Sequence, residues 1–173
     1  MPRPVGIAAD DEILCIQLQN DTSVDEDYIS TTAQDSIKAQ LPQGLELLSV
    51  NIVESKTSFQ PYSAQYILTV RKKYLNEELK ATIKRLLASE SLDVQRRIVK
   101  KKSRTGAQES TVKNIDVRDF LESIELDNDS TIIKCKITPT GSIRIEEILS
   151  LLGLDIEKLA SPIRRTSVQW RSN

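Results

Sequence analysis

Histidine is absent from the 173 residues of this chain. It is the side chain that most often serves as general base, metal ligand and pH-dependent switch, so sites built on those roles are disfavoured. The two cysteines, Cys15 and Cys135, each lie in an apolar run that alternates like a strand, and alone they cannot form a zinc or iron–sulfur site. We therefore expect buried free thiols in a reducing compartment, the cytoplasm, and no metal bound by the chain.

Aromatic residues are also scarce, at 4%, and neither a glycine-rich phosphate loop nor a Cys–His pair is present. The hydrophobic content of 39% still suffices for a core built from Ile, Leu and Val. No apolar run resembles a signal peptide or a membrane-spanning segment. The composition predicts a folded binding protein away from membranes, rather than an enzyme.

Charge is nearly balanced, at −1 overall, but it is unevenly distributed. Eight acids and no base lie between Arg3 and Lys38, whereas the stretch from Arg96 to Lys113 has seven bases and a single acid, Glu109. The basic stretch indicates either an anionic partner such as RNA or a solvated strand end entering a polar loop. It contains no aromatic residue that could stack on a base.

Hydrophobic periodicity predicts an α+β fold. Residues 1–103 show strands at 12–19, 45–53, 64–70 and 92–102, with helices at 24–41, opened by a capping box at 23–26, and at 76–89. This order, βαββαβ, is typical of a ferredoxin-like unit.

A polar basic linker is expected at residues 104–114, followed by an αβαβ extension at 115–173. Asp116 is expected to cap a helix at 117–124, and Ser142 to cap a helix at 143–152 that Gly153 ends. Strands follow at 131–138 and 163–170. This extension either packs on the same sheet or forms a small second subdomain.

Two arginines of the extension fall in the expected first helical turns, Arg118 and Arg144. A cation there opposes the helix dipole, unless the helix start and the arginine together hold a phosphate or carboxylate. The alternative is that both pair with nearby acids or extend into solvent. We predict an anion site with Asp116 orienting Arg118, and the full set of anion- or RNA-binding candidates is Arg96, Arg97, Lys100, Lys101, Lys113, Arg118, Arg144 and Arg165.

Five short pieces, in order along nearly the whole chain, resemble the radical SAM-associated domain of unknown function. They are "PRPVGIAADDEILCIQL", "LPQGLELLSV", "KNIDVRDFLESI", "TGSIRIEEILSLLGL" and "IRRT". The family pattern often has proline where this chain has Ile145. Members usually carry an upstream radical SAM domain, whose three-cysteine motif holds a 4Fe–4S cluster, and their genes often lie near those for ribonuclease E/G.

The resemblance implies an accessory role for a chain that lacks the three-cysteine motif. We expect either a stand-alone protein or an excised domain that binds neither the 4Fe–4S cluster nor S-adenosylmethionine, and that presents RNA or a ribosome-related substrate to a radical SAM partner. A second possibility is a protein-interaction module that docks a catalytic partner. A third is an independent RNA-modifying enzyme, related in fold to pseudouridine synthases, with Asp116 as the essential carboxylate.

Overall fold

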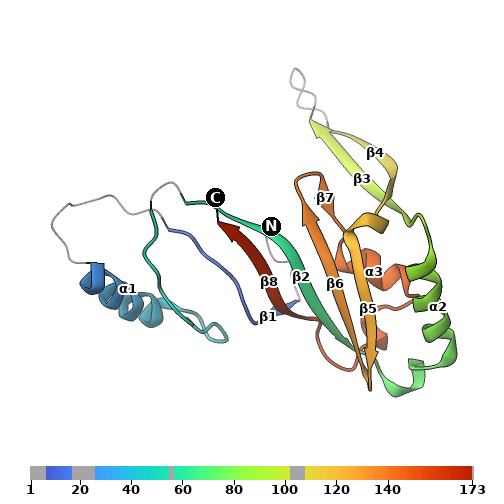
Figure 1. Cartoon of the computed structure of the whole chain (residues 1–173), viewed down its shortest axis with the longest axis horizontal. Helices are drawn as coiled ribbons and strands as arrows, with labels where there is room; N and C mark the ends of the chain where they lie inside the picture. Colours follow the sequence, from blue (N-terminus) through green and yellow to red (C-terminus); the bar gives the residue numbers. More distant parts are fainter. Residues whose placement is uncertain (1–6, 17–25, 55–56, 102–107, 173) are drawn as a thin grey trace. The chain divides into compact units, whose positions relative to one another are not determined.

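The computed structural model describes residues 7–16, 26–54, 57–101 and 108–172 (Figure 1). Side chains are described for the same residues except 26–30, 99–101 and 108–109. The chain is a mixture of helices and sheets, as predicted, and it divides into two compact units. One unit is formed by residues 1–12 with 60–171, and the other by residues 13–59 with 172–173.

The larger unit is built on one main sheet. In spatial order its strands are β1 (Ala8–Ala9), β8 (Arg164–Ser172), β2 (Phe59–Thr69), β6 (Ser130–Thr138) and β5 (Leu121–Asp127), and the short β7 (Gly141–Ser142) pairs with β6. β1 runs parallel to β8, whereas β6 is antiparallel to β2, β5 and β7. The predicted strands at 64–70, 131–138 and 163–170 are thereby confirmed, although β2 begins earlier than expected.

Two helices supply much of the core. α2 (Glu77–Ala88) begins where the side chain of Asn76 accepts a hydrogen bond from the Leu79 N–H at 3.0 Å, and it buries Leu79, Ile83 and Leu86, as its periodicity predicts. α3 (Ile145–Leu151) buries Ile145, Ile148 and Leu149. Both helical faces belong to one apolar cluster with sheet residues such as Leu68 and Ile133. Short 3₁₀ turns lie at Lys72–Tyr74, Arg118–Phe120 and Ile156–Lys158.

A separate two-stranded hairpin is formed by β3 (Asp93–Lys101) and β4 (Gln108–Asp116). The strand expected at 92–102 is confirmed. The expected linker at 104–114 is not a linker over its described part, because residues 108–114 pair along β3. Residues 104–107 lie outside the described residues.

The prediction of a helix at residues 117–124 is wrong. A single 3₁₀ turn leads directly into β5, which pairs with β6 along its length. The register shifts between Leu121 and Ser123, so Leu121 and Ile124 both face the core although they are three residues apart. A bulge of this kind gives a strand the apolar spacing of a helix, and this spacing misled the prediction.

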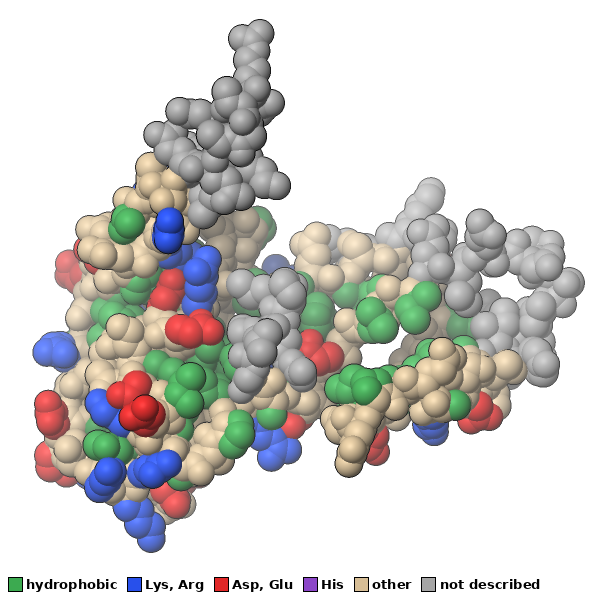
Figure 2. Space-filling view, turned by 180° about the vertical axis from the view of Figure 1, so that it is seen from behind, with side chains coloured by type: hydrophobic (Ala, Val, Ile, Leu, Met, Phe, Trp, Pro, Cys, Tyr) green, Lys and Arg blue, Asp and Glu red, His purple; other side chains and the backbone are tan. Residues whose placement is uncertain are grey.

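The smaller unit contains α1 (Glu26–Gln40), which confirms the first predicted helix. The strands expected at 12–19 and 45–53 are absent over their described residues, and the side chains of Leu14, Ile16 and Leu48 are exposed. Figure 2 shows hydrophobic side chains at the surface of this unit. An alternating segment becomes a strand only beside a sheet edge. Without these two strands, the ferredoxin-like arrangement is not reproduced in the described part of the chain.

The two cysteines differ in their surroundings. Cys135 on β6 is buried, as predicted, and burial raises the pKa of its thiol to about 12. Cys15 is exposed, against expectation, because its segment does not join a sheet.

Gly153 ends α3 as the sequence predicts. Its φ of 66° is left-handed, its N–H donates to the Ser150 carbonyl, and the Leu154 N–H donates to the Leu149 carbonyl at 2.8 Å. This is a Schellman ending, which favours glycine. We expect Gly153→Ala to lower the free energy of unfolding by about 1–2 kcal/mol in urea titrations. Ser150→Ala, an exposed helical control, should change it by less than about 0.5 kcal/mol; equal effects would contradict the strained-glycine explanation.

Candidate anion-binding groove

A hollow of about 550 Å³ lies in the larger unit, where the ends of several elements meet. Its lining includes Tyr62 from β2, Arg96 from β3, Arg144 at the start of α3 and Arg171 from β8. We call this hollow the arginine groove. The volume lies within the range of small-molecule sites. Three guanidinium groups that are far apart in the sequence thus come to one place.

Arg96 is fixed in the wall of this groove by ion pairing. Its Nε and a terminal nitrogen donate to the two carboxylate oxygens of Glu147 at 2.7 and 2.8 Å, and the same terminal nitrogen donates to the Ser142 carbonyl at 2.6 Å. Both charged side chains are mostly buried, at 13% and 12% exposure. The hydrogen bond to Glu147 raises the pKa of Arg96. Arg96 therefore joins the β3–β4 hairpin to α3 and is largely neutralised.

Arg144 is the N-cap residue of α3 and directly precedes the helix, whereas the sequence predicted it within the first helical turn. Its N–H donates to the Glu147 carboxylate at 2.9 Å, so Glu147 serves both the helix start and Arg96. The prediction that Ser142 caps this helix is wrong. Ser142 is buried in β7, and its carbonyl accepts a hydrogen bond from Arg96. The Arg144 side chain is exposed, and its positive charge, like that of Arg96, helps to lower the pKa of Glu147.

Arg171 and Tyr62 were not identified from the sequence. The Arg171 guanidinium carbon lies 4.5 Å from the centre of the Tyr62 ring, which is a cation–π contact. Tyr62 follows Pro61 in the first part of β2, before residue 64, where the strand was expected to begin. No local pattern marks the pair, because the contact joins β2 and β8, which are neighbours in the sheet but far apart in the sequence.

Arg118 lies in a different place and has a different role. Its guanidinium donates to the carbonyls of Ser89 and Leu87 at the end of α2, at 2.9 and 3.0 Å, and to that of Leu121 at 2.9 Å. A cation at a helix C-terminus favours the dipole. The prediction that Arg118 opens an α-helix is therefore wrong. Its anion binding with Arg144 stays a prediction, and the three carbonyls that hold its guanidinium disfavour it.

Arg165 is also not part of an exposed anion site. It is buried in β8 and forms an ion pair with Glu12, while the neighbouring Arg164 donates to Asp10 at 2.8 Å. Part of the acid-rich N-terminal segment thus balances the two arginines of "IRRT". The parallel pairing of β1 with β8 brings these oppositely charged segments together.

The remaining basic candidates lie on the β3–β4 hairpin. Lys113 is exposed and lies directly across from Arg96, hence on the same face of the hairpin. Arg97 is exposed on the opposite face and donates to the Ser110 hydroxyl at 3.1 Å. Lys100 and Lys101 are in β3, but their side chains are not among those that the structure describes. Lys102 lies outside the described residues.

Asp116 organises a turn between strands rather than a helix start. One of its carboxylate oxygens accepts from the Leu92 N–H at 2.8 Å and from the Arg118 N–H at 2.9 Å. These backbone hydrogen bonds, that of Leu92 first, lower the pKa of Asp116. A carboxylate stabilised in its ionised form is a weak proton acceptor, so the geometry accounts for Asp116 without catalysis.

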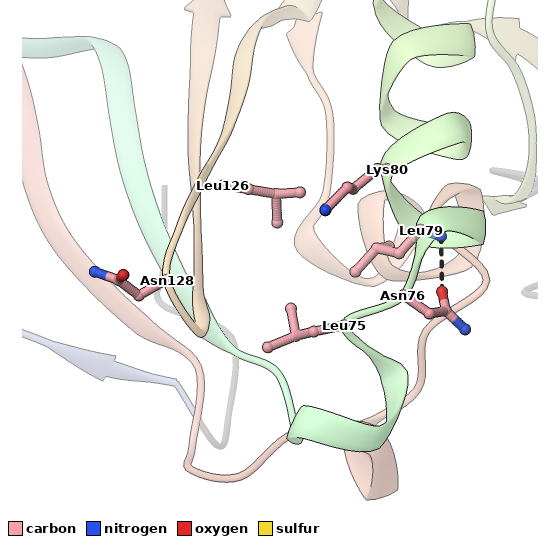
Figure 3. A pocket seen from close by; sticks show the side chains of 6 residues that line it. All are labelled: Leu75, Asn76, Leu79, Lys80, Leu126 and Asn128. Atoms are coloured by element: carbon pink, nitrogen blue, oxygen red, sulfur yellow. Dashed lines mark hydrogen bonds between the residues drawn. The ribbon is translucent and has the colours of Figure 1, made fainter.

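A second hollow, of about 320 Å³, lies beside the start of α2 (Figure 3). Its polar groups already have partners: the Asn76 side chain caps α2, and the Lys80 ammonium is 2.7 Å from Glu77. Leu75, Leu79 and Leu126 supply its apolar lining. It offers fewer uncommitted polar groups than the arginine groove.

No cluster of three or more potential metal ligands occurs within the described ranges. In the same ranges, none of the helices combines the length and apolarity needed to cross a bilayer. Neither curated proteins nor solved structures gave a match to this sequence. One family model does match, over residues 1–149, and its description is an uncharacterized protein conserved in bacteria. The chain therefore belongs to this bacterial family, DUF2344.

Proposed function

We propose that the chain is a non-catalytic accessory domain that binds RNA or an RNA-bound substrate, with the arginine groove as its anion-binding surface. The observation that supports this most directly is the convergence of Arg96, Arg144 and Arg171 on one hollow. Of these three, Arg96 is neutralised by a mostly buried ion pair with Glu147, whereas Arg144 and Arg171 are exposed. Two exposed guanidinium groups remain available for phosphate, which they bind through paired N–H donors.

The resemblance to radical SAM-associated domains extends this proposal to a partner. A radical SAM catalytic domain, joined to this chain or separate from it, would hold the 4Fe–4S cluster and S-adenosylmethionine, and this domain would present the substrate to it. The expected setting is the cytoplasm. Lys113, on the same hairpin face as Arg96, would extend the positive surface beside the groove.

A second candidate function is a docking module for a protein partner. It is favoured by exposed apolar side chains on two segments of the smaller unit: Ile13, Leu14, Ile16, Leu45, Leu48, Ile52 and Val53. The two functions predict different responses to salt, because phosphate contacts release counterions and apolar contacts do not.

Fluorescence anisotropy with a labelled tRNA, over a series of salt concentrations, tests the proposal. We expect Arg144→Ala/Arg171→Ala to weaken binding by about ten-fold or more and to reduce the log–log salt slope by about 1–2. The matched control is Lys84→Ala/Arg85→Ala, which removes two exposed charges from α2, outside the groove.

The two double mutants have the same net charge, so a purely general electrostatic attraction would weaken both equally. That result would contradict a groove-specific site. Absence of RNA binding by the wild type at low salt would contradict the function itself and would direct attention to the docking alternative. Duplex DNA of similar length serves as the non-RNA comparison.

A further inference from the structure

The lining of the arginine groove contains apolar side chains that are not needed to bind a phosphate. Phosphate needs only N–H donors, and Arg144 and Arg171 supply them. The lining also presents apolar surface, which includes the ring of Tyr62 and the two prolines Pro61 and Pro139. Flat apolar faces beside cations are what an exposed nucleobase stacks on. Resting on the proposed function, we infer that the groove binds an unpaired nucleotide of an RNA, with its base stacked on the Tyr62–Arg171 pair.

The stacking platform is already assembled in the structure. The Arg171 guanidinium lies over the Tyr62 ring at 4.5 Å, and Tyr62 is half-buried, so its ring orientation is restricted by packing. A guanidinium plane stacks on bases as an aromatic ring does, and it attracts the neighbouring phosphate as well. The base can therefore stack on the exposed side of this pair without reorganising the strands.

The remaining polar groups suit the other parts of a nucleotide. Arg144, directly before α3, lines the same groove, and its exposed guanidinium is able to contact a phosphate beside the stacked base. Gln60, at the start of β2, is exposed and offers both a donor and an acceptor to a base edge. Arg96 is held by Glu147 and forms part of the groove wall.

The form of the site argues against a duplex as the ligand. A hollow of about 550 Å³ has the volume for one nucleotide or a ligand of similar size. Double-stranded RNA hides its base faces and is bound across an extended surface of phosphates and 2′-hydroxyl groups. Tyr62 would have nothing to stack on in a duplex, whereas an unpaired base presents its full face.

The test compares a labelled unstructured RNA of twelve nucleotides with the same strand annealed to its complement, by anisotropy with the full chain. We expect the single strand to bind at least about ten-fold more tightly than the duplex. Tyr62→Leu removes the ring without changing charge, and should weaken single-strand binding by about 5- to 100-fold. Duplex binding and the salt slope should stay unchanged, and Tyr62→Phe should bind within about two-fold of wild type.

The outcomes separate this inference from the function on which it rests. If both RNAs bind equally, and Tyr62→Leu has no effect while Arg144→Ala/Arg171→Ala weakens both, the anion site stands and the unpaired-nucleotide inference is overturned. If neither RNA binds, both fail. Should Tyr62→Leu not fold, Arg171→Lys replaces it, because it keeps the charge but removes the stacking plane. Unchanged single-strand binding in that variant would overturn the inference.

Discussion

Replacing Arg96 by alanine is expected to lower the free energy of unfolding by about 3–5 kcal/mol. The substitution leaves the Glu147 carboxylate mostly buried without its bidentate partner, and leaves the Ser142 carbonyl without a donor. Removing one member of a buried ion pair is strongly destabilising because the remaining charge stays desolvated. Urea denaturation at neutral pH measures the loss.

Arg97→Ala is the matched control, since Arg97 is the next residue of β3 but is exposed and contacts only the Ser110 hydroxyl among its described neighbours. It should change stability by less than about 0.5 kcal/mol. In Arg96→Ala/Glu147→Gln the buried charge is removed, so part of the lost stability should return. If Arg96→Ala is no less stable than Arg97→Ala, the pair does not hold the hairpin to α3.

The same pair predicts a dependence on pH. Burial by itself raises the pKa of Glu147, but the hydrogen bonds from Arg96 and from the Arg144 N–H outweigh it, and the pKa lies below its usual 4.5. A depressed folded-state pKa contributes stability above the unfolded-state value and loses it as pH falls through the folded-state value. The stability difference between wild type and Arg96→Ala should therefore be full at neutral pH and shrink in acid, as Glu147 becomes protonated first in the variant and then in the wild type. A difference that is constant down to pH 2 would exclude Glu147 as the partner.

The second large effect is expected at Arg118. Arg118→Ala should lower the free energy of unfolding by about 2–3 kcal/mol, because three main-chain carbonyls lose a charged donor at once. Two of these carbonyls, of Leu87 and Ser89, are at the end of α2 and have few other donors. The groove is not involved, so RNA affinity and its salt slope should remain those of the wild type.

Arg85→Ala provides the control for Arg118, since both arginines are near the C-terminus of α2 and Arg85 is exposed. Its loss removes only a favourable dipole interaction, of about 0.3–1 kcal/mol. Hydrogen exchange of the last turn of α2 should accelerate in Arg118→Ala and not in Arg85→Ala. Weakened RNA binding with unchanged stability would instead restore Arg118 as an anion ligand.

The sequence predicted an element correctly where the residues that cap it and form its apolar face lie within the element itself. α2 has its cap at Asn76 and its apolar stripe within one segment, and α3 has its glycine ending at Gly153. The strands at the centre of the sheet were also recognised, since β6 alternates over its whole length. Each of these follows from contacts between residues close in sequence or from a regular apolar period.

Prediction failed where a distant segment supplied the partner. Asp116 has the sequence context of a helix cap, but its carboxylate accepts from the N–H of Leu92, directly before the other strand of the hairpin. Leu121 and Ile124 have helical spacing, but β6 offers a sheet edge and a bulge accommodates the spacing. The segments around Leu14 and Leu48 alternate like strands, yet the structure gives them no edge on which to pair.

The sequence by itself determined that this is an α+β protein with a basic stretch around β3, and it named two of the three arginines of the groove, Arg96 and Arg144. Only the tertiary structure decided which cations are structural. Arg96, Arg118 and Arg165 are committed to Glu147, to backbone carbonyls and to Glu12, respectively. Arg171 lines the groove, where its guanidinium stacks on the Tyr62 ring. The reason is physical: whether a guanidinium is neutralised depends on acceptors brought within about 3 Å by strand pairing and helix packing, and these distances are not set by position along the chain.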